Sequence, residues 1–208
     1  MERPDISDQK ASLFPGIFDV VLENGLKATT MDIVAERFGI SKRTLYEIFE
    51  SKNQMLIETL DYVNSLHCDM VRREFENCDT VIEAMLRISA AVAKNIQRIN
   101  PSFFRDMDNL YSDMRENYEK AADSRRQAMI EIFAKGVDQG VFRRDVDFRI
   151  QARLLEIQLE AIKRMEGLFP EDIPSDIIYR ELTVTFLRGI ASGEGLEILS
   201  NILPRIYE

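Results

Sequence analysis

Side chains suited to metal binding or redox chemistry are few in this 208-residue chain. The one histidine, His67, lies beside Cys68, and the second cysteine is Cys78. Histidine and thiolate bind zinc or copper, so a metal or redox sensor is one interpretation of this group. Three ligands, two of them adjacent, make a poor chelating geometry on a helix, and cysteines that only pack are commoner. We therefore expect no metal and no cofactor.

Motifs for catalysis are also scarce. The sequence has no glycine-rich phosphate loop, no nucleophile elbow and no paired-carboxylate motif with supporting context. Arg125-Arg126 and Arg143-Arg144 are basic doublets, but each lies among acids and is typical of a solvated surface. We expect that the protein is not an enzyme.

A short stretch from Ser41 to Lys52 has the side chains for binding phosphates and base edges. Ser41 would cap a helix predicted from Lys42 to Phe49, whose first amides and dipole can also face phosphates. Lys42 and Arg43 fall in its first turn, from which side chains reach bases or backbone. Three cations and two acids give this stretch a charge of only +1. The whole chain carries −9, so any contact with DNA must be local.

The elements that position these side chains are predicted to be helices. Glycines number only 9, and no run of alternating β-branched residues is bounded by hairpin turns, which favours an all-α fold. Pro15 suits the first turn of a helix that starts late, after a loosely ordered lead-in. The predicted helices cover about residues 13–22, 31–38, 42–49, 52–76, 81–99, 102–110, 111–139, 148–168 and 176–190.

Residues 29–52 form a helix, a glycine turn and a second helix, the arrangement that seats a helix in the major groove. They read Thr29-Thr-Met-Asp-Ile-Val-Ala-Glu-Arg-Phe-Gly-Ile-Ser-Lys-Arg-Thr-Leu-Tyr-Glu-Ile-Phe-Glu-Ser-Lys52. The segment closely resembles the tetracycline-repressor (TetR) family, whose signature is a Thr-Thr cap, Ile-Ala-Glu, Gly-Val-Ser, Thr-Leu-Tyr-x-x-Phe and a Ser-Lys pair. The resemblance is strong over roughly residues 13–60 and weak beyond.

The resemblance implies a three-helix helix-turn-helix DNA-binding domain over residues 1–52 and a helical effector-binding and dimerisation domain over 53–208. By analogy, Thr44, Tyr46 and Lys52 would contact phosphates, while Lys42 and Arg43 are candidates for reading bases. The expected DNA-binding residues are Thr30, Ser41, Lys42, Arg43, Thr44, Tyr46 and Lys52.

Two positions depart from the family's pattern, and two inner positions anchor the second helix. Glu47 places an acid on this helix, which could accept a hydrogen bond from a cytosine amine or repel phosphate. Ile48 stands where the family often has an aromatic residue or histidine. Leu45 and Phe49, at i and i+4, should pack inward.

The middle of the chain is rich in methionine and aromatic residues, which line apolar pockets well. The family uses this region for an inducer cavity, so a small, largely apolar effector is expected. For each single residue, ordinary core is the simpler interpretation, because an amphipathic helix needs such a stripe anyway. The candidate pocket residues are Met85, Phe103, Phe104, Met107, Tyr111, Met114, Met129 and Phe133.

Two helices near the C-terminus, over 148–168 and 176–190, are expected to form a four-helix dimer interface, as the resemblance implies. The candidate interface residues are Leu155, Leu159, Ile162, Leu182 and Phe186. The predicted function is that of a ligand-responsive regulator, most simply a repressor, which binds a palindromic operator as a cytoplasmic homodimer without membrane association. The alternative is an all-helical protein-interaction module that no longer binds DNA.

Overall fold

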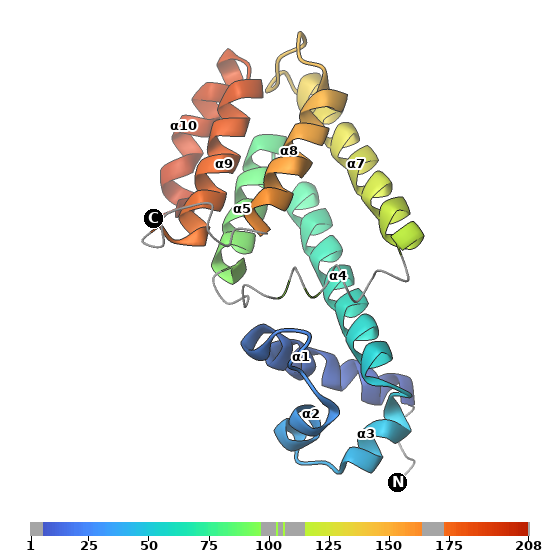
Figure 1. Cartoon of the computed structure of the whole chain (residues 1–208). Coiled ribbons are helices and arrows are strands. Elements are labelled where there is room, and N and C mark those ends of the chain that lie inside the picture. The colour runs from blue at the N-terminus through green and yellow to red at the C-terminus, as the bar shows by residue number, and fades with distance from the viewer. Residues whose placement is uncertain (1–5, 97–102, 104–105, 107–114, 164–172, 208) are drawn as a thin grey trace. The chain divides into compact units, whose positions relative to one another are not determined.

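The computed structural model describes residues 6–96, 103, 106, 115–163 and 173–207 (Figure 1). These residues are almost entirely helical and contain no β-strand, only an isolated bridge between Phe142 and Ala191. The all-α fold class is therefore confirmed. None of the described helices is long and apolar enough to span a membrane. The helices are α1 (Ile6–Asn24), α2 (Met31–Phe38), α3 (Lys42–Ile48), α4 (Lys52–Asn77), α5 (Val81–Ile96), α7 (Arg115–Asp138), α8 (Phe148–Lys163), α9 (Ser175–Ile190) and α10 (Gly193–Tyr207).

The chain divides into two compact units. Unit 1 comprises residues 1–69 and 98–110, and unit 2 comprises residues 70–97 and 111–208. The division falls within α4, because the first turns of this helix belong to the core of unit 1, where Met55 and Leu56 are buried. The functional boundary at residue 52 stays a prediction.

Helix α1 differs from its predicted form, because it begins at Ile6 and contains Pro15 in its interior. Proline has no N–H to donate within the helix, so the predicted late start was reasonable. Contacts on both sides of Pro15 hold the longer helix in place. Phe14 lies against Tyr62 of α4, with ring centroids 5.1 Å apart, and Ile17 is completely buried. Tertiary packing thus outweighs the local signal.

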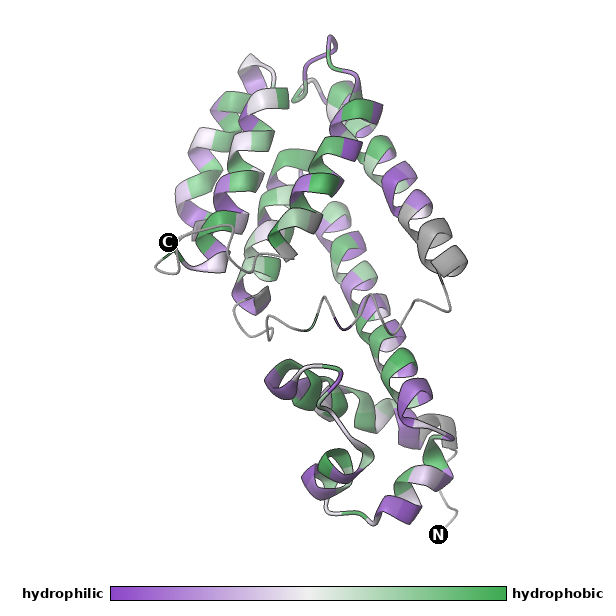
Figure 2. Ribbon diagram, viewed as in Figure 1, coloured by the Kyte–Doolittle hydropathy of each residue, from purple (hydrophilic) through white to green (hydrophobic). Residues whose placement is uncertain are grey.

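Unit 2 is built around α5, which packs against α9 and α10, while α7 packs against α8 (Figure 1). Figure 2 shows that these helices carry both hydrophobic and hydrophilic residues, as amphipathic helices do. Four phenylalanine rings meet in the core, with Phe133 within 6.1 Å of each of the other three. The completely or almost completely buried residues include Ile82, Leu86, Phe133, Phe142, Leu187 and Leu199.

Helix α10 is absent from the helices that the sequence predicts. It contains Gly193, Gly195 and Pro204, which normally interrupt helices. Gly195 is needed for packing, since a Cβ atom there would lie 2.0 Å from the carbonyl oxygen of Val141. Gly195 thus allows α10 to approach the turn after α7, whereas a Cβ atom at Gly193 would meet nothing within 4 Å.

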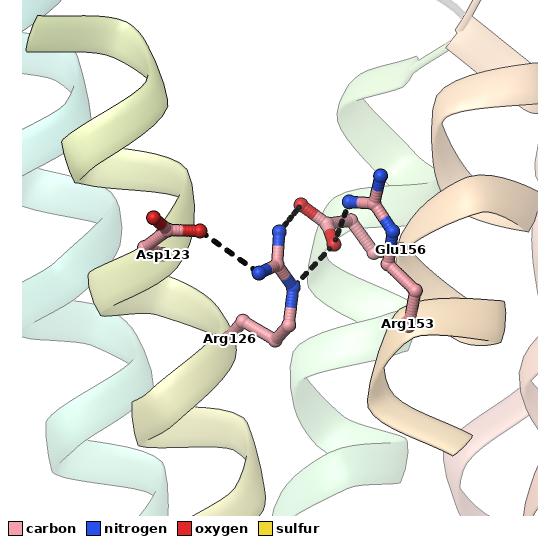
Figure 3. Close-up of polar contacts among 4 residues, drawn as sticks. All are labelled: Asp123, Arg126, Arg153 and Glu156. Atoms are coloured by element: carbon pink, nitrogen blue, oxygen red, sulfur yellow. Dashed lines mark hydrogen bonds and ion pairs between the residues drawn. The ribbon is translucent and has the colours of Figure 1, made fainter. Parts of the chain in front are cut away.

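An ion-pair network ties α7 to α8 (Figure 3). The Arg126 guanidinium of α7 donates to both carboxylate oxygens of Glu156 on α8, at 2.8 and 3.3 Å, and to Asp123 at 2.8 Å. Arg153 of α8 donates to Glu156 at 2.9 Å. The hydrogen bonds from Arg126, followed by those from Arg153, hold the pKa of the Glu156 carboxyl below its ordinary value.

Candidate DNA-binding site

Helix α2 and the turn after it are fixed by local caps. The Thr30 side chain accepts a hydrogen bond from the N–H of Ile33 at 3.3 Å. At the other end, Gly39 has φ +63°, a left-handed conformation that glycine adopts without strain. Its N–H donates to the Glu36 carbonyl at 3.1 Å. Both ends of α2 are therefore set by the residues that the sequence singled out.

Helix α3 begins at the predicted cap. Ser41 Oγ accepts from the N–H of Thr44 at 3.0 Å and lies 2.8 Å from the Thr44 hydroxyl. Leu45 and Phe49 are completely buried, which confirms that they pack inward. Lys10 of α1 lies over the Phe49 ring at 5.3 Å. The inner side of α3 is thus anchored, and its opposite side is left for other contacts.

The outer side of α3 presents Lys42, Arg43, Tyr46 and Glu47, all exposed. Lys42 Nζ donates to Asp32 Oδ2 of α2 at 2.8 Å, and this hydrogen bond raises the pKa of Lys42 above its ordinary value. Arg43 Nε donates to Glu47 Oε1 at 3.2 Å. Each cation that the sequence assigns to base reading therefore has a carboxylate partner.

Lys52 differs from the other predicted phosphate contacts because its ammonium is engaged within unit 1. Lys52 Nζ donates to the carbonyl of Lys27 at 2.7 Å, and partial burial lowers the pKa of Lys52. The N–H of Lys27 donates in turn to Asp106 at 3.0 Å. Nearby in sequence, Phe103 packs edge-on against Phe18 at 6.4 Å. No sequence signal connects Asp106 with Lys27.

The predicted pocket residues fall into both units. Phe103 is buried in unit 1, whereas Met85, Met129 and Phe133 belong to the core of unit 2. Phe104, Met107, Tyr111 and Met114 lie outside the described residues. The effector site therefore stays a prediction.

Unit 2 also has an open cavity of about 400 Å³ whose lining includes none of the predicted residues. Helices α5, α9 and α10 surround it, and a hydrogen-bond chain lies beside it. Tyr207 donates to Ser89 at 3.0 Å, and Ser89 donates to Thr183 at 3.0 Å. Its lining residues are Ala90, Ala93, Lys94, Asp176, Ile177, Arg180, Ile206 and Tyr207.

The predicted interface residues pack against the core of their own chain. Leu155 and Ile162 of α8 are each 6% exposed. Leu159, Leu182 and Phe186 are partly buried against the same core. The exposed large apolar residues of α8 are Ile150, Leu154 and Ile157, which are 56%, 47% and 51% exposed. Their spacing of i, i+4 and i+7 places them in one stripe, which we call the α8 stripe.

The histidine–cysteine group is dispersed. Cys68 is exposed, whereas Cys78 is partly buried with its thiol 3.8 Å from a Glu74 carboxylate oxygen. Burial and the nearby acids raise the pKa of the Cys78 thiol, which disfavours the reactive thiolate. Within the described ranges, no three His, Cys, Asp or Glu side chains are grouped to hold a metal ion.

Comparisons with known proteins agree with the geometry of α2 and α3. A family model described as bacterial regulatory proteins, tetR family, matches residues 18–59. The HTH-type transcriptional repressor KstR2 of Rhodococcus jostii is 26% identical over 160 residues, covering 74% of this chain and 74% of that protein.

Solved structures show the same fold over most of the chain. The ketosteroid transcriptional regulator KstR2 of Mycobacterium tuberculosis has a TM-score of 0.62 at 20% identity, covering 92% of this chain and 97% of that one. A putative regulator from Saccharomonospora viridis, solved in complex with choline, has a TM-score of 0.68 at 20% identity, covering 89% and 99%. The chain thus resembles bacterial regulators of the tetR family over residues 18–59, and it shares the fold of these solved regulators over most of its length.

Proposed function

We propose that the protein is a TetR-family repressor that binds a palindromic operator as a homodimer in the cytoplasm and releases it when an effector binds. The observation that carries the proposal is α3 itself. Its buried side is anchored by Leu45 and Phe49, while Arg43 and Tyr46 project outward. A capped helix with such an outer side is suited to the major groove.

The α8 stripe supports the homodimer. Exposed isoleucine and leucine side chains at helical spacing are typical of a surface that another subunit covers. Gly189 of α9 offers a second feature, because a Cβ atom built there meets nothing within 4 Å. A neighbouring helix could therefore approach α9 closely. A two-fold dimer would present two copies of α3 to successive half-sites about one DNA turn apart.

Helix α4 supports the coupling between effector and operator. It runs without interruption from Lys52 to Asn77 and contributes residues to both units. An effector that binds unit 2 better in one of two conformations would shift the population toward that conformation. We propose a small, largely apolar effector, in keeping with Met85 and Met129 at the edge of the unit 2 core.

The test is a fluorescence titration of the protein with DNA from upstream of its own gene, at two salt concentrations. The double variant Arg43→Ala, Tyr46→Ala should bind at least 10- to 100-fold more weakly, since a good base contact contributes about 1–3 kcal/mol. Arg188→Ala, which removes an exposed arginine of α9, is the charge-matched control and should bind like the wild type.

Two results would contradict the proposal. If random-site selection recovers no preferred DNA, the chain is better explained as a protein-interaction module, for which the acid-paired cations of α3 are the favouring observation. If a small molecule binds the protein but leaves operator affinity unchanged, that molecule is not the effector and the release step loses its support.

A further inference from the structure

We propose that Glu47 is a positioning residue for base recognition, which holds Arg43 so that its two terminal nitrogens read a guanine in the major groove. The inference rests on the proposed DNA-binding function and adds to it the base that is read and the residue that directs the reading.

The Arg43 guanidinium has five N–H donors in a planar fork. The bond to Glu47 Oε1 uses Nε, at 3.2 Å, so the contact between these two side chains is made from that nitrogen and not from the terminal ones. The two terminal nitrogens are the donors that match guanine O6 and N7 as a bidentate pair. Glu47 therefore holds the side of the fork that guanine recognition does not need.

The pair is poorly explained as a device for helix stability. An i,i+4 pair stabilises a helix best when the acid precedes the base, because the helix dipole favours acids near the N-terminus. Here Arg43 precedes Glu47 within the short helix α3. The Arg43 side chain is 90% exposed, and such ion pairs contribute little to folding.

Glu47 gives a different benefit once the helix enters a groove. An arginine that is already oriented loses less conformational freedom on binding than a mobile one. The carboxylate also partly neutralises Arg43, which weakens its attraction to phosphates on any DNA. Both effects increase the difference in affinity between DNA that has a guanine facing Arg43 and DNA of random sequence.

Lys42 is held in a different way, which leaves Arg43 as the better reader. Its partner Asp32 lies on α2 and bonds the terminal ammonium itself, the group that would have to contact DNA. Asp32 takes one of the three N–H donors of Lys42 and holds the ammonium toward α2, whereas both terminal nitrogens of Arg43 remain available while Nε is paired with Glu47.

The experiment compares wild type, Glu47→Ala, Glu47→Gln and Arg43→Ala by random-site selection, followed by titrations with the selected DNA and with single-base variants of it. Wild type should lose roughly 10- to 100-fold in affinity when the guanine of a single half-site is replaced. Arg43→Ala should abolish that discrimination. Glu47→Ala should reduce it to a few-fold, and Glu47→Gln should restore part of it because the amide oxygen still accepts from Nε.

Affinity for random DNA gives the second readout. Glu47→Ala removes one acid from each of the two α3 helices of the dimer, which should strengthen random-DNA binding by about 30-fold at 0.15 M salt and steepen the logarithmic salt dependence by about 1.8. Glu50→Gln is the matched control, because it removes the same charge from an exposed position just after α3. It should leave the guanine discrimination unchanged.

Each contrary result has a distinct meaning. A base-preference profile that is the same in wild type and Glu47→Ala would overturn the inference while leaving the DNA-binding function intact. Loss of a preferred cytosine, with the guanine preference retained, would show that Glu47 reads a base directly and would also overturn it. A wild type that selects no DNA sequence would contradict the proposed function itself.

Discussion

Replacing the α8 stripe with charge should separate the proposed dimer without unfolding the chain. Full burial of a leucine or isoleucine side chain stabilises by about 1.5–3 kcal/mol. Ile150, Leu154 and Ile157 are each about half exposed, so covering one contributes about 1 kcal/mol. In the double variant Leu154→Glu, Ile157→Glu, four such side chains are lost across the interface, or about 4 kcal/mol. The dimer dissociation constant should rise about 1,000-fold.

Sedimentation equilibrium across a wide concentration range measures this constant directly. The matched control is Leu66→Glu, Leu196→Glu, which places two acids at leucines that are 49% and 41% exposed on α4 and α10. The control should dimerise like the wild type. Circular dichroism should show native helix content in both double variants.

An unchanged dimerisation constant in the α8 variant would refute the assignment of the stripe. Unfolding of that variant would show that Leu154 and Ile157 are needed for folding of the single chain, despite their exposure. Leu155→Glu gives the contrast, because Leu155 is 6% exposed and a buried charge there should unfold the chain.

Three further predictions concern stability. Phe133→Ala should lower the free energy of unfolding by about 3–5 kcal/mol, because the ring is completely buried against Phe142, Phe148 and Phe186. Ser41→Ala should destabilise by about 1 kcal/mol by removing the α3 cap, and Ser41→Thr should retain most of the stability. Asp147→Asn should lower stability at neutral pH but not near pH 2, since the Arg149 hydrogen bond lowers the pKa of Asp147 to about 2.

The sign for Asp147 follows from its lowered pKa. A carboxyl with a depressed pKa in the folded state stabilises the protein above its unfolded value of about 3.9. That contribution is lost as pH falls toward about 2. Urea titrations of wild type and variant should therefore converge across this window. If the stabilities of wild type and Asp147→Asn differ by the same amount down to pH 2, the lowered pKa of Asp147 is contradicted. Urea midpoints that Phe133→Ala or Ser41→Ala leave unchanged would contradict the predictions for those two variants.

The sequence predicted the parts of the fold that local chemistry decides. Thr30, Gly39 and Ser41 mark the ends of α2 and α3 because caps and left-handed turns depend on neighbouring residues. The start of α1 was wrong because Pro15 is overruled by contacts with α4, and α10 was missed because Gly195 serves packing instead of ending a helix.

Side-chain partners were harder to predict than helices. Helix α8 has apolar residues on more than one side, so the sequence could not tell which side meets its own core and which remains exposed. The link from Asp106 through Lys27 to Lys52 joins residues far apart in the chain. The Arg43–Glu47 spacing was visible, but the choice of Nε as the bonded nitrogen was not.

The contacts of Phe103 and Asp106 have a consequence for building hybrid regulators. Engineers often join the operator-reading part of one repressor to the sensor of another with a single crossover. In this chain such a crossover within α4 would separate Phe18 and Lys27 from their partners at Phe103 and Asp106. A hybrid that keeps these contacts must therefore take residues 103–106 from the same parent protein as the N-terminal part.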